Sequence, residues 1–155
     1  MAQVALLIGS KSDVEAVRPA LQILERFGVS CQPTVCSAHR APERLRQVVK
    51  EAEAGGVQVF ITGAGLAAAL PGAVAALTTR PVIGVPLASG ALNGVDSLYS
   101  IVQMPPGVPV ATVGINGAAN AAYLTVQILA LADTALAERV TAWRQEQSSR
   151  IDTFE

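Results

Sequence analysis

The fold is decided near the start of the chain, at residues 4–28, which read VALLIGSKSDVEAVRPALQILERFG. The run Val4–Ile8 is short and apolar, as expected of a strand that is buried in a parallel sheet. Residues 14–27 carry large apolar side chains at helical spacing, and Ser12 or Asp13 is expected to cap this helix. A buried strand that leads directly into an amphipathic helix is the first half of a βαβ unit.

The rest of the chain continues this alternation of short apolar runs and helical stretches. It predicts about five parallel strands with helices on both faces of the sheet, in one domain over residues 1–155. The later strands are expected to end near Cys36 and to span residues 57–62, 81–87 and 108–115. The later helices are expected at residues 42–54, 70–77, 95–104 and 118–131, and from Asp133 onward.

The last two predicted helices differ in composition. Residues 118–131 are mostly apolar and carry no charge, so we expect this helix to be buried on nearly all sides. The final helix has an apolar face with Leu136, Val140 and Trp143, and it becomes polar from residue 145 onward. We expect its outer half to lie across a neighbouring subunit.

Composition limits the class of protein. Among 155 residues, 51% are hydrophobic, and 11 Lys and Arg stand against 12 Asp and Glu. The balanced charge argues against a nucleic-acid partner, and no apolar run approaches the roughly 20 residues of a membrane span. The apolar excess suggests a surface covered by other copies in a homo-oligomer. Since no secretory leader is recognisable and the single histidine allows no Cys/His cluster, we expect a cytoplasmic protein without a metal site.

Three segments follow predicted strands, where parallel sheets bind their ligands. The first, at residues 9–13, reads GSKSD. Gly9 permits close approach, and the hydroxyls of Ser10 and Ser12 at the start of a helix suit a phosphate. Asp13 suits ribose hydroxyls. A plain helix cap would require similar residues.

The second segment, at residues 37–42, reads SAHRAP. His39 is a group that titrates near neutrality, and Arg40 beside it is a fixed cation suited to phosphate. A surface loop with incidental charges is the alternative. The position at the carboxyl end of a strand favours a functional site.

The third segment, at residues 63–72, reads GAGLAAALPG. It matches part of a dinucleotide fingerprint, but it follows the third strand and lacks an acidic residue about 20 positions later, so neither NAD nor FAD is expected. It is interpreted as a tight, amide-rich turn that lets a planar ligand or a carboxylate approach the backbone. Close packing of a helix on the sheet could require the same small residues.

Together the three segments resemble the bacterial carboxyaminoimidazole ribonucleotide mutases, also described as the catalytic subunit of phosphoribosylaminoimidazole carboxylase. Later strings are similar to this family as well: PVIGVP at 81–86, LNGVDSL at 92–98, SIVQMP at 100–105 and NGAANAA at 116–122. The resemblance covers nearly the whole chain. It implies an α/β fold of the flavodoxin-like type, a three-layer αβα sandwich with a five-stranded parallel sheet. It also implies a homo-octamer with active sites at the subunit contacts.

The activity that this resemblance implies is an isomerase reaction of purine (IMP) biosynthesis. It converts 5-carboxyaminoimidazole ribonucleotide to 4-carboxy-5-aminoimidazole ribonucleotide by decarboxylation and recarboxylation, with no cofactor. By the same resemblance, His39 moves protons, Ser10, Ser12 and Arg40 hold the phosphate, and Asp13 holds the ribose. The remaining substrate-binding positions would be Ser37, Ala38, Gly63, Ala64, Gly65, Leu66, Ala69, Ser89 and Leu92.

Two positions depart from the family pattern. A second histidine usually precedes the Leu-Pro-Gly string, where this chain has Ala69, and Leu66 stands where glycine is common. Because both changes fall in the expected pocket, direct carboxylation of aminoimidazole ribonucleotide, or action on a related heterocycle, is an alternative activity. A non-catalytic nucleotide-binding subunit is another alternative, which the retention of His39 disfavours.

Overall fold

The computed structural model describes residues 2–151 and builds one five-stranded, all-parallel sheet from them. The strands lie in the order β2-β1-β3-β4-β5. This is the flavodoxin-like order, and its topological switch point lies between β1 and β3. The predicted fold class is confirmed. The strands are β1 (Val4–Ile8), β2 (Cys31–Val35), β3 (Val59–Gly65), β4 (Val82–Leu87) and β5 (Ala111–Thr112).

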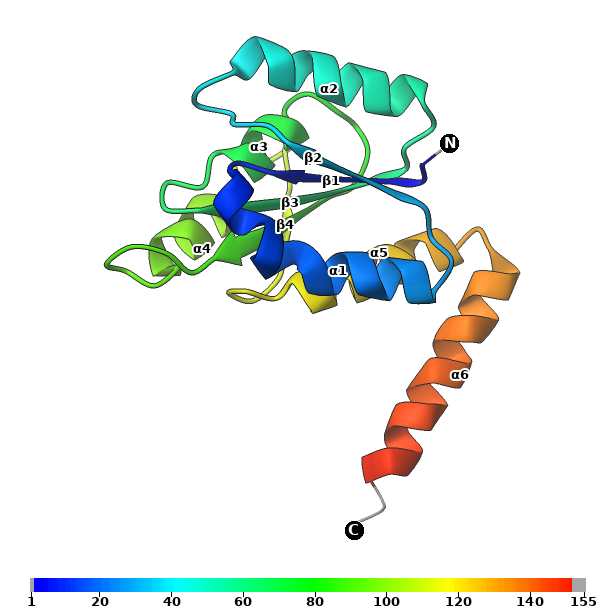
Figure 1. Cartoon of the computed structure of the whole chain (residues 1–155). Helices are drawn as coiled ribbons and strands as arrows, with labels where there is room; N and C mark the ends of the chain where they lie inside the picture. The colour runs from blue at the N-terminus through cyan, green and yellow to red at the C-terminus, as the bar shows by residue number, and fades with distance from the viewer. Residues whose placement is uncertain (1, 152–155) are drawn as a thin grey trace.

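Helices cover both faces of the sheet, as Figure 1 shows. On one face α1 (Val14–Arg26) packs beside α5 (Ala118–Ala130), and on the other lie α2 (Pro42–Ala54), α3 (Leu70–Ala75) and α4 (Val95–Val102). Strand β1 supplies both cores, because successive side chains point to opposite faces. Val4, Leu6 and Ile8 join the core under α1 and α5, whereas Ala5 and Leu7 join the other.

Strand β3 is longer than predicted and shifted toward the carboxyl end. It runs to Gly65 because the ladder with its neighbours continues, with Gly63 paired to Ile8 and Val85. The glycines at 63 and 65 therefore belong to a strand, and the prediction that the turn begins at residue 63 is wrong. A Cβ on Gly63 would lie 3.1 Å from Cγ1 of Val17, so this glycine lets α1 pack closely on the sheet.

The fifth strand is shorter than the predicted span of residues 108–115. Only Ala111–Thr112 pairs with β4, through Ile83 and Gly84. Pro109 has no backbone N–H to donate to a ladder, which limits pairing on its side of this edge strand. The predicted strand exists, but most of its expected length is a loop along the sheet edge.

The start of α1 also differs in part from the prediction. A 3₁₀ turn at Lys11–Asp13 precedes the helix, and the residue that caps it is Ser10, whose side-chain oxygen accepts a hydrogen bond from the Ser12 amide at 3.3 Å. Asp13 occupies the N-cap position of α1 but makes no side-chain capping bond. The expected N-cap position at Asp13 is therefore confirmed, but the side-chain hydrogen bond that usually accompanies it is absent.

Helix α5 buries one face fully, and the residues of its other face are partly buried except Asn120, which is exposed. Its buried residues recur at helical spacing toward α1 and the sheet, while Tyr123, Leu124 and Ile128 are only partly buried. The expectation of burial on nearly all sides holds in part, because the outer residues of the helix are partly buried rather than fully buried. Its buried residues are Ala118, Ala121, Ala122, Thr125, Val126 and Leu129.

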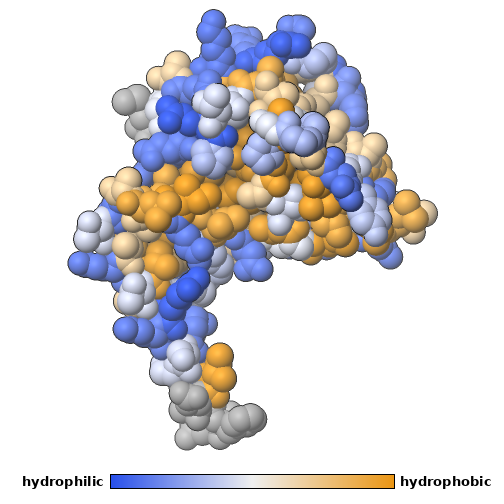
Figure 2. All heavy atoms as spheres, turned by 180° about the vertical axis from the view of Figure 1, so that it is seen from behind, coloured by the Kyte–Doolittle hydropathy of each residue, from blue (hydrophilic) through white to orange (hydrophobic). Residues whose placement is uncertain are grey.

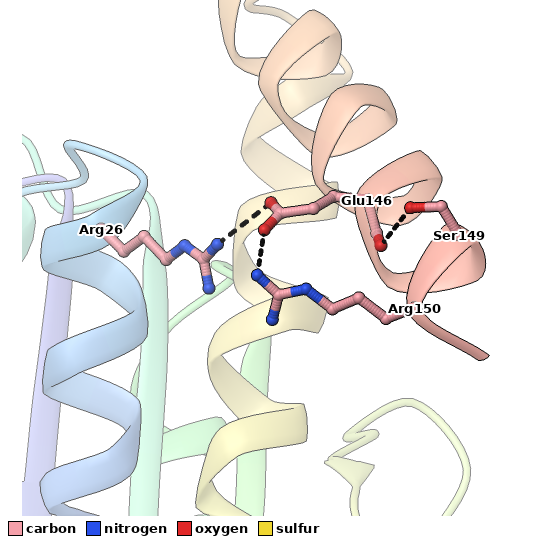
Figure 3. A network of polar contacts seen from close by, with 4 residues as sticks. All are labelled: Arg26, Glu146, Ser149 and Arg150. Atoms are coloured by element: carbon pink, nitrogen blue, oxygen red, sulfur yellow. Dashed lines mark hydrogen bonds and ion pairs between the residues drawn. The ribbon is translucent and has the colours of Figure 1, made fainter. Parts of the chain in front are cut away.

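Helix α6 (Thr134–Ile151) projects away from the rest of the molecule (Figure 1). It is anchored by Leu136, which is buried, and by Trp143 near its middle, which stacks on Tyr123 of α5 with ring centroids 4.3 Å apart. Further out, the Glu146 carboxylate accepts from both Arg26 of α1 and Arg150 (Figure 3). Among the described helices, none has both the length and the apolar character to span a membrane.

Candidate active site

A cavity of about 470 Å³ opens at the carboxyl ends of β1, β2 and β3, at the topological switch point. The three segments singled out in the sequence meet there, although they are far apart along the chain. The loop after β4 adds one residue. The lining residues are Gly9, Ser10, Ser12, Asp13, Ser37, Ala38, His39, Arg40, Ala64, Gly65, Leu66, Ala67, Ala68, Ala69, Leu70 and Ser89.

One side of the cavity, here named the polar wall, consists of Ser10, Ser12, Asp13, Ser37, His39 and Arg40. Its first part is held by hydroxyl contacts. The Ser12 hydroxyl lies 2.9 Å from the Ser10 hydroxyl oxygen and 3.4 Å from a carboxylate oxygen of Asp13. These contacts gather two hydroxyls and one carboxylate directly after β1.

Arg40 ties the two loops of the polar wall together. Its backbone N–H donates to the Ser37 hydroxyl at 3.2 Å, and its guanidinium donates to the same hydroxyl at 3.4 Å. A second guanidinium nitrogen donates to the carbonyl of Gly9 at 3.4 Å. The cation of the loop after β2 is thereby held beside the serine loop after β1.

His39 lines the cavity with an exposed side chain, between Ala38 and Arg40. The neighbouring thiol of Cys36 is buried and lies outside the cavity lining. Burial raises the pKa of the Cys36 thiol, with the charge of Arg44 opposing this shift, so the thiol stays protonated at neutral pH. The imidazole of His39, unlike this thiol, lines the cavity and can therefore exchange a proton with a bound ligand.

A second part of the lining, here named the apolar wall, comes from the end of β3 and the segment after it and consists of Ala64, Leu66, Ala67, Ala68, Ala69 and Leu70. Its shape comes from the backbone. The N–H of Ala68 donates to the Leu66 carbonyl at 2.8 Å, and the N–H of Ala69 donates to the Ala67 carbonyl at 2.7 Å. Each bond closes a three-residue turn, so the chain coils tightly before α3 begins. The side chains of this segment are methyl groups and two leucines, so it offers the cavity no charged or hydroxyl side chain.

Two of the predicted site residues lie elsewhere. Gly63 lies within β3 beneath α1, and Leu92 lies in the loop before α4 with a side chain that is 60% exposed. The other predicted residues line the cavity. Sequence reasoning did not select Ala67, Ala68 or Leu70 individually, since nothing in a run of small apolar residues indicates which of them face a ligand.

Three comparisons agree on the family. The AIR carboxylase family model matches residues 3–150. The N5-carboxyaminoimidazole ribonucleotide mutase of Saccharolobus solfataricus is 52% identical over 151 residues, which cover 97% of this chain and 96% of that protein. The enzyme of the same name from Escherichia coli is 51% identical over 97% of this chain and 90% of its own length. The crystal structure of Treponema denticola PurE superposes with a TM-score of 0.88 at 32% identity, covering 96% of this chain and 92% of that one.

Proposed function

Because the chain belongs to the AIR carboxylase family, we propose that it converts N5-carboxyaminoimidazole ribonucleotide to 4-carboxy-5-aminoimidazole ribonucleotide in purine biosynthesis. This reaction moves a carboxyl group within one nucleotide, and the enzyme is an isomerase. One observation of the structure supports it most directly. The only histidine of the chain lines a cavity whose lining combines hydroxyls and a guanidinium, which suit a phosphate, with a run of small apolar residues.

The polar wall suits the ribose phosphate of the substrate. Ser10 and Ser12 offer two hydroxyls, and Arg40 offers a guanidinium that is already held in place by Ser37 and the Gly9 carbonyl. A phosphate in this position would receive charge-assisted hydrogen bonds. The Asp13 carboxylate makes no capping hydrogen bond to α1, so it is available for the ribose hydroxyls. The heterocycle would then lie toward His39 and the apolar wall.

In this arrangement His39 serves both half reactions. The imidazolium protonates the carbamate nitrogen, the bond from that nitrogen to the carboxyl carbon breaks, and carbon dioxide leaves. The enamine-like carbon of the aminoimidazole then attacks carbon dioxide to form the new carbon–carbon bond. The same carbon next loses its proton to the neutral imidazole. His39 thus ends in its starting protonation state, and the reaction consumes no other reactant.

Carbon dioxide must stay in the cavity between the two half reactions. It carries no charge and its oxygens are weak hydrogen-bond acceptors, so hydroxyls and cations hold it poorly. An apolar wall that excludes water and lies close to the aminoimidazole keeps carbon dioxide near the carbon with which it must react. The alanines and leucines of residues 64–70 provide such a surface.

We also propose that the chain forms a homo-oligomer and that the octamer is its functional state. On α4, Val95, Tyr99 and Val102 are exposed at helical spacing. Figure 2 shows a broad band of hydrophobic residues over the side of the molecule hidden in Figure 1, and α6 extends beyond the body. Size exclusion with light scattering should give eight times the mass of one chain, whereas a stable monomer would contradict the proposal. The cytoplasmic location stays a prediction.

The test of the activity supplies the purified protein with the carbamate nucleotide in buffer that contains ¹³C-bicarbonate. A mutase forms the carboxylated product mainly with unlabelled carbon, since the migrating carboxyl group comes from the substrate. A direct carboxylase forms labelled product, and it does so from free aminoimidazole ribonucleotide as well. A binding subunit forms no product above the reaction without protein, and that result would refute the proposed function.

A further inference from the structure

Among the residues that line the cavity, Leu66 has the backbone conformation that is least expected for its residue type. Its φ is +54°, and the other non-glycine residues with positive φ in residues 2–151 are two asparagines, Asn93 and Asn116. Asparagine visits the left-handed region readily, but a leucine there brings its Cβ too close to the following carbonyl oxygen. The Leu66 side chain is also 55% exposed, so burial in the core does not compensate for this conformation.

The Leu66 side chain contacts the loop after β4, at the edge of the cavity. A Cβ built on Gly90 would lie 2.8 Å from Cδ2 of Leu66, so the leucine tip rests on the bare backbone of this glycine. One residue earlier, a Cβ on Gly65 would lie 2.6 Å from the Ser89 hydroxyl. The end of β3 and the loop after it therefore meet the loop after β4 at two successive points, and at each point a side chain of one segment lies against a glycine of the other.

We propose that Leu66 is a retention residue for carbon dioxide, a positioning residue whose side chain closes the apolar edge of the cavity between the two half reactions. This inference rests on the proposed function. The costly backbone conformation directs the isobutyl group across the gap to Gly90, where it can lie over a bound heterocycle. Leu66 takes no proton and holds no charge. Its effect falls on the fate of carbon dioxide rather than on bond breaking.

The proposal predicts that a larger fraction of the carbon dioxide escapes instead of recombining, without a loss of protein stability. This division of carbon dioxide between escape and recombination is called the partition below. The carbamate nucleotide is supplied in ¹³C-bicarbonate buffer, and free aminoimidazole and labelled product are measured per carbamate consumed, after subtraction of the reaction without protein. Leu66→Gly should raise both quantities severalfold while carbamate consumption changes little. Its melting temperature should not fall, because glycine adopts a positive φ without strain.

Two further substitutions separate the side chain from the backbone. Leu66→Asn tolerates the left-handed conformation but is polar, so it should leak carbon dioxide as Leu66→Gly does. Leu66→Met restores an apolar side chain of similar length and should return the partition toward that of the parent. The control is Leu131→Gly, since Leu131 is an exposed leucine after α5 that does not line the cavity and has no predicted role in the site. It should leave the partition unchanged.

The outcomes that overturn the inference differ from those that overturn the proposed function. If the parent forms no product, the mutase activity itself is refuted. If the parent is active and Leu66→Gly gives the parental partition, Leu66 does not retain carbon dioxide. Leakage that comes with a lower melting temperature or a smaller assembled mass would show a structural role for Leu66 and would equally overturn the inference.

Discussion

The polar wall and the apolar wall face the same cavity, but different interactions hold them in place. Hydrogen bonds between side chains and backbone fix the polar wall, with Arg40 joined to both Ser37 and Gly9. The apolar wall takes its shape from two consecutive three-residue turns after β3. Replacing a side chain should therefore disturb the polar wall readily, whereas the course of the apolar wall depends little on its methyl groups.

This difference separates two kinds of effect on the proposed reaction. Groups of the polar wall bind charge and move protons, so their loss should lower affinity or turnover. Groups of the apolar wall carry no charge, so their replacement should alter the fraction of carbon dioxide that recombines. A polar-wall variant that changed only the partition, or an apolar-wall variant that abolished binding, would break this division.

The largest effect is expected for His39→Asn. Asparagine keeps some size and hydrogen bonding but cannot transfer the proton, and no other histidine exists in the chain. Turnover should fall by at least roughly a hundredfold, the low end for a lost general acid or base. Steady-state kinetics give the rate, while circular dichroism and calorimetry should show a folded variant that still binds nucleotide. Interconversion at the parental rate would refute the role of His39.

The next effect is expected for Arg40→Ala. If Arg40 holds the phosphate, nucleotide binding should weaken by about 1.5–3 kcal/mol, the range for a hydrogen bond to a charged group. Lys11→Ala is the matched control, because Lys11 is an exposed cation in the turn between Ser10 and Ser12 but does not line the cavity. Calorimetry should show a clear loss of affinity for Arg40→Ala alone. Equal losses for both variants would indicate a general charge effect instead.

The polar wall could be predicted well from the sequence, for a physical reason. Hydroxyls, a carboxylate and a His-Arg pair at strand ends are unusual enough to indicate a site by residue type alone. The flavodoxin-like fold and the family also followed from the pattern and its resemblance, and the comparisons confirm them. The C-terminal helix on a neighbouring subunit and the individual ligand contacts stay predictions.

The apolar wall could be predicted only in outline. Small residues suit a tight turn, a strand under a closely packed helix and a cavity lining equally well, and the string at residues 63–72 contains all three. Gly63 meets α1, whereas Ala69 faces the cavity. Leu92 was assigned to the pocket with its loop, but only Ser89 of that loop lines the cavity. Such distinctions depend on strand register and φ angles, which residue type does not determine.

The smallest effect is expected for Ala69→His, in the apolar wall. Ala69 has an exposed side chain that lines the cavity, and its backbone has right-handed helical angles that a histidine adopts without strain. Its N–H and carbonyl already bond within the turn and to α3, so the substitution leaves these bonds in place. The added imidazole could donate a hydrogen bond to the migrating carboxylate, which a methyl group cannot do.

We therefore expect Ala69→His to raise the rate modestly and to lower the free aminoimidazole formed per carbamate consumed. Ala69→Leu is the control, because it fills the same space without a hydrogen-bond donor. If both variants reduce leakage equally, filling the cavity matters and the imidazole does not. If neither differs from the parent, Ala69 is a neutral change. If Ala69→His lowers turnover while Leu66→Gly combined with it restores the rate, the ring competes with Leu66 for room, and the two residues act on the same part of the apolar wall.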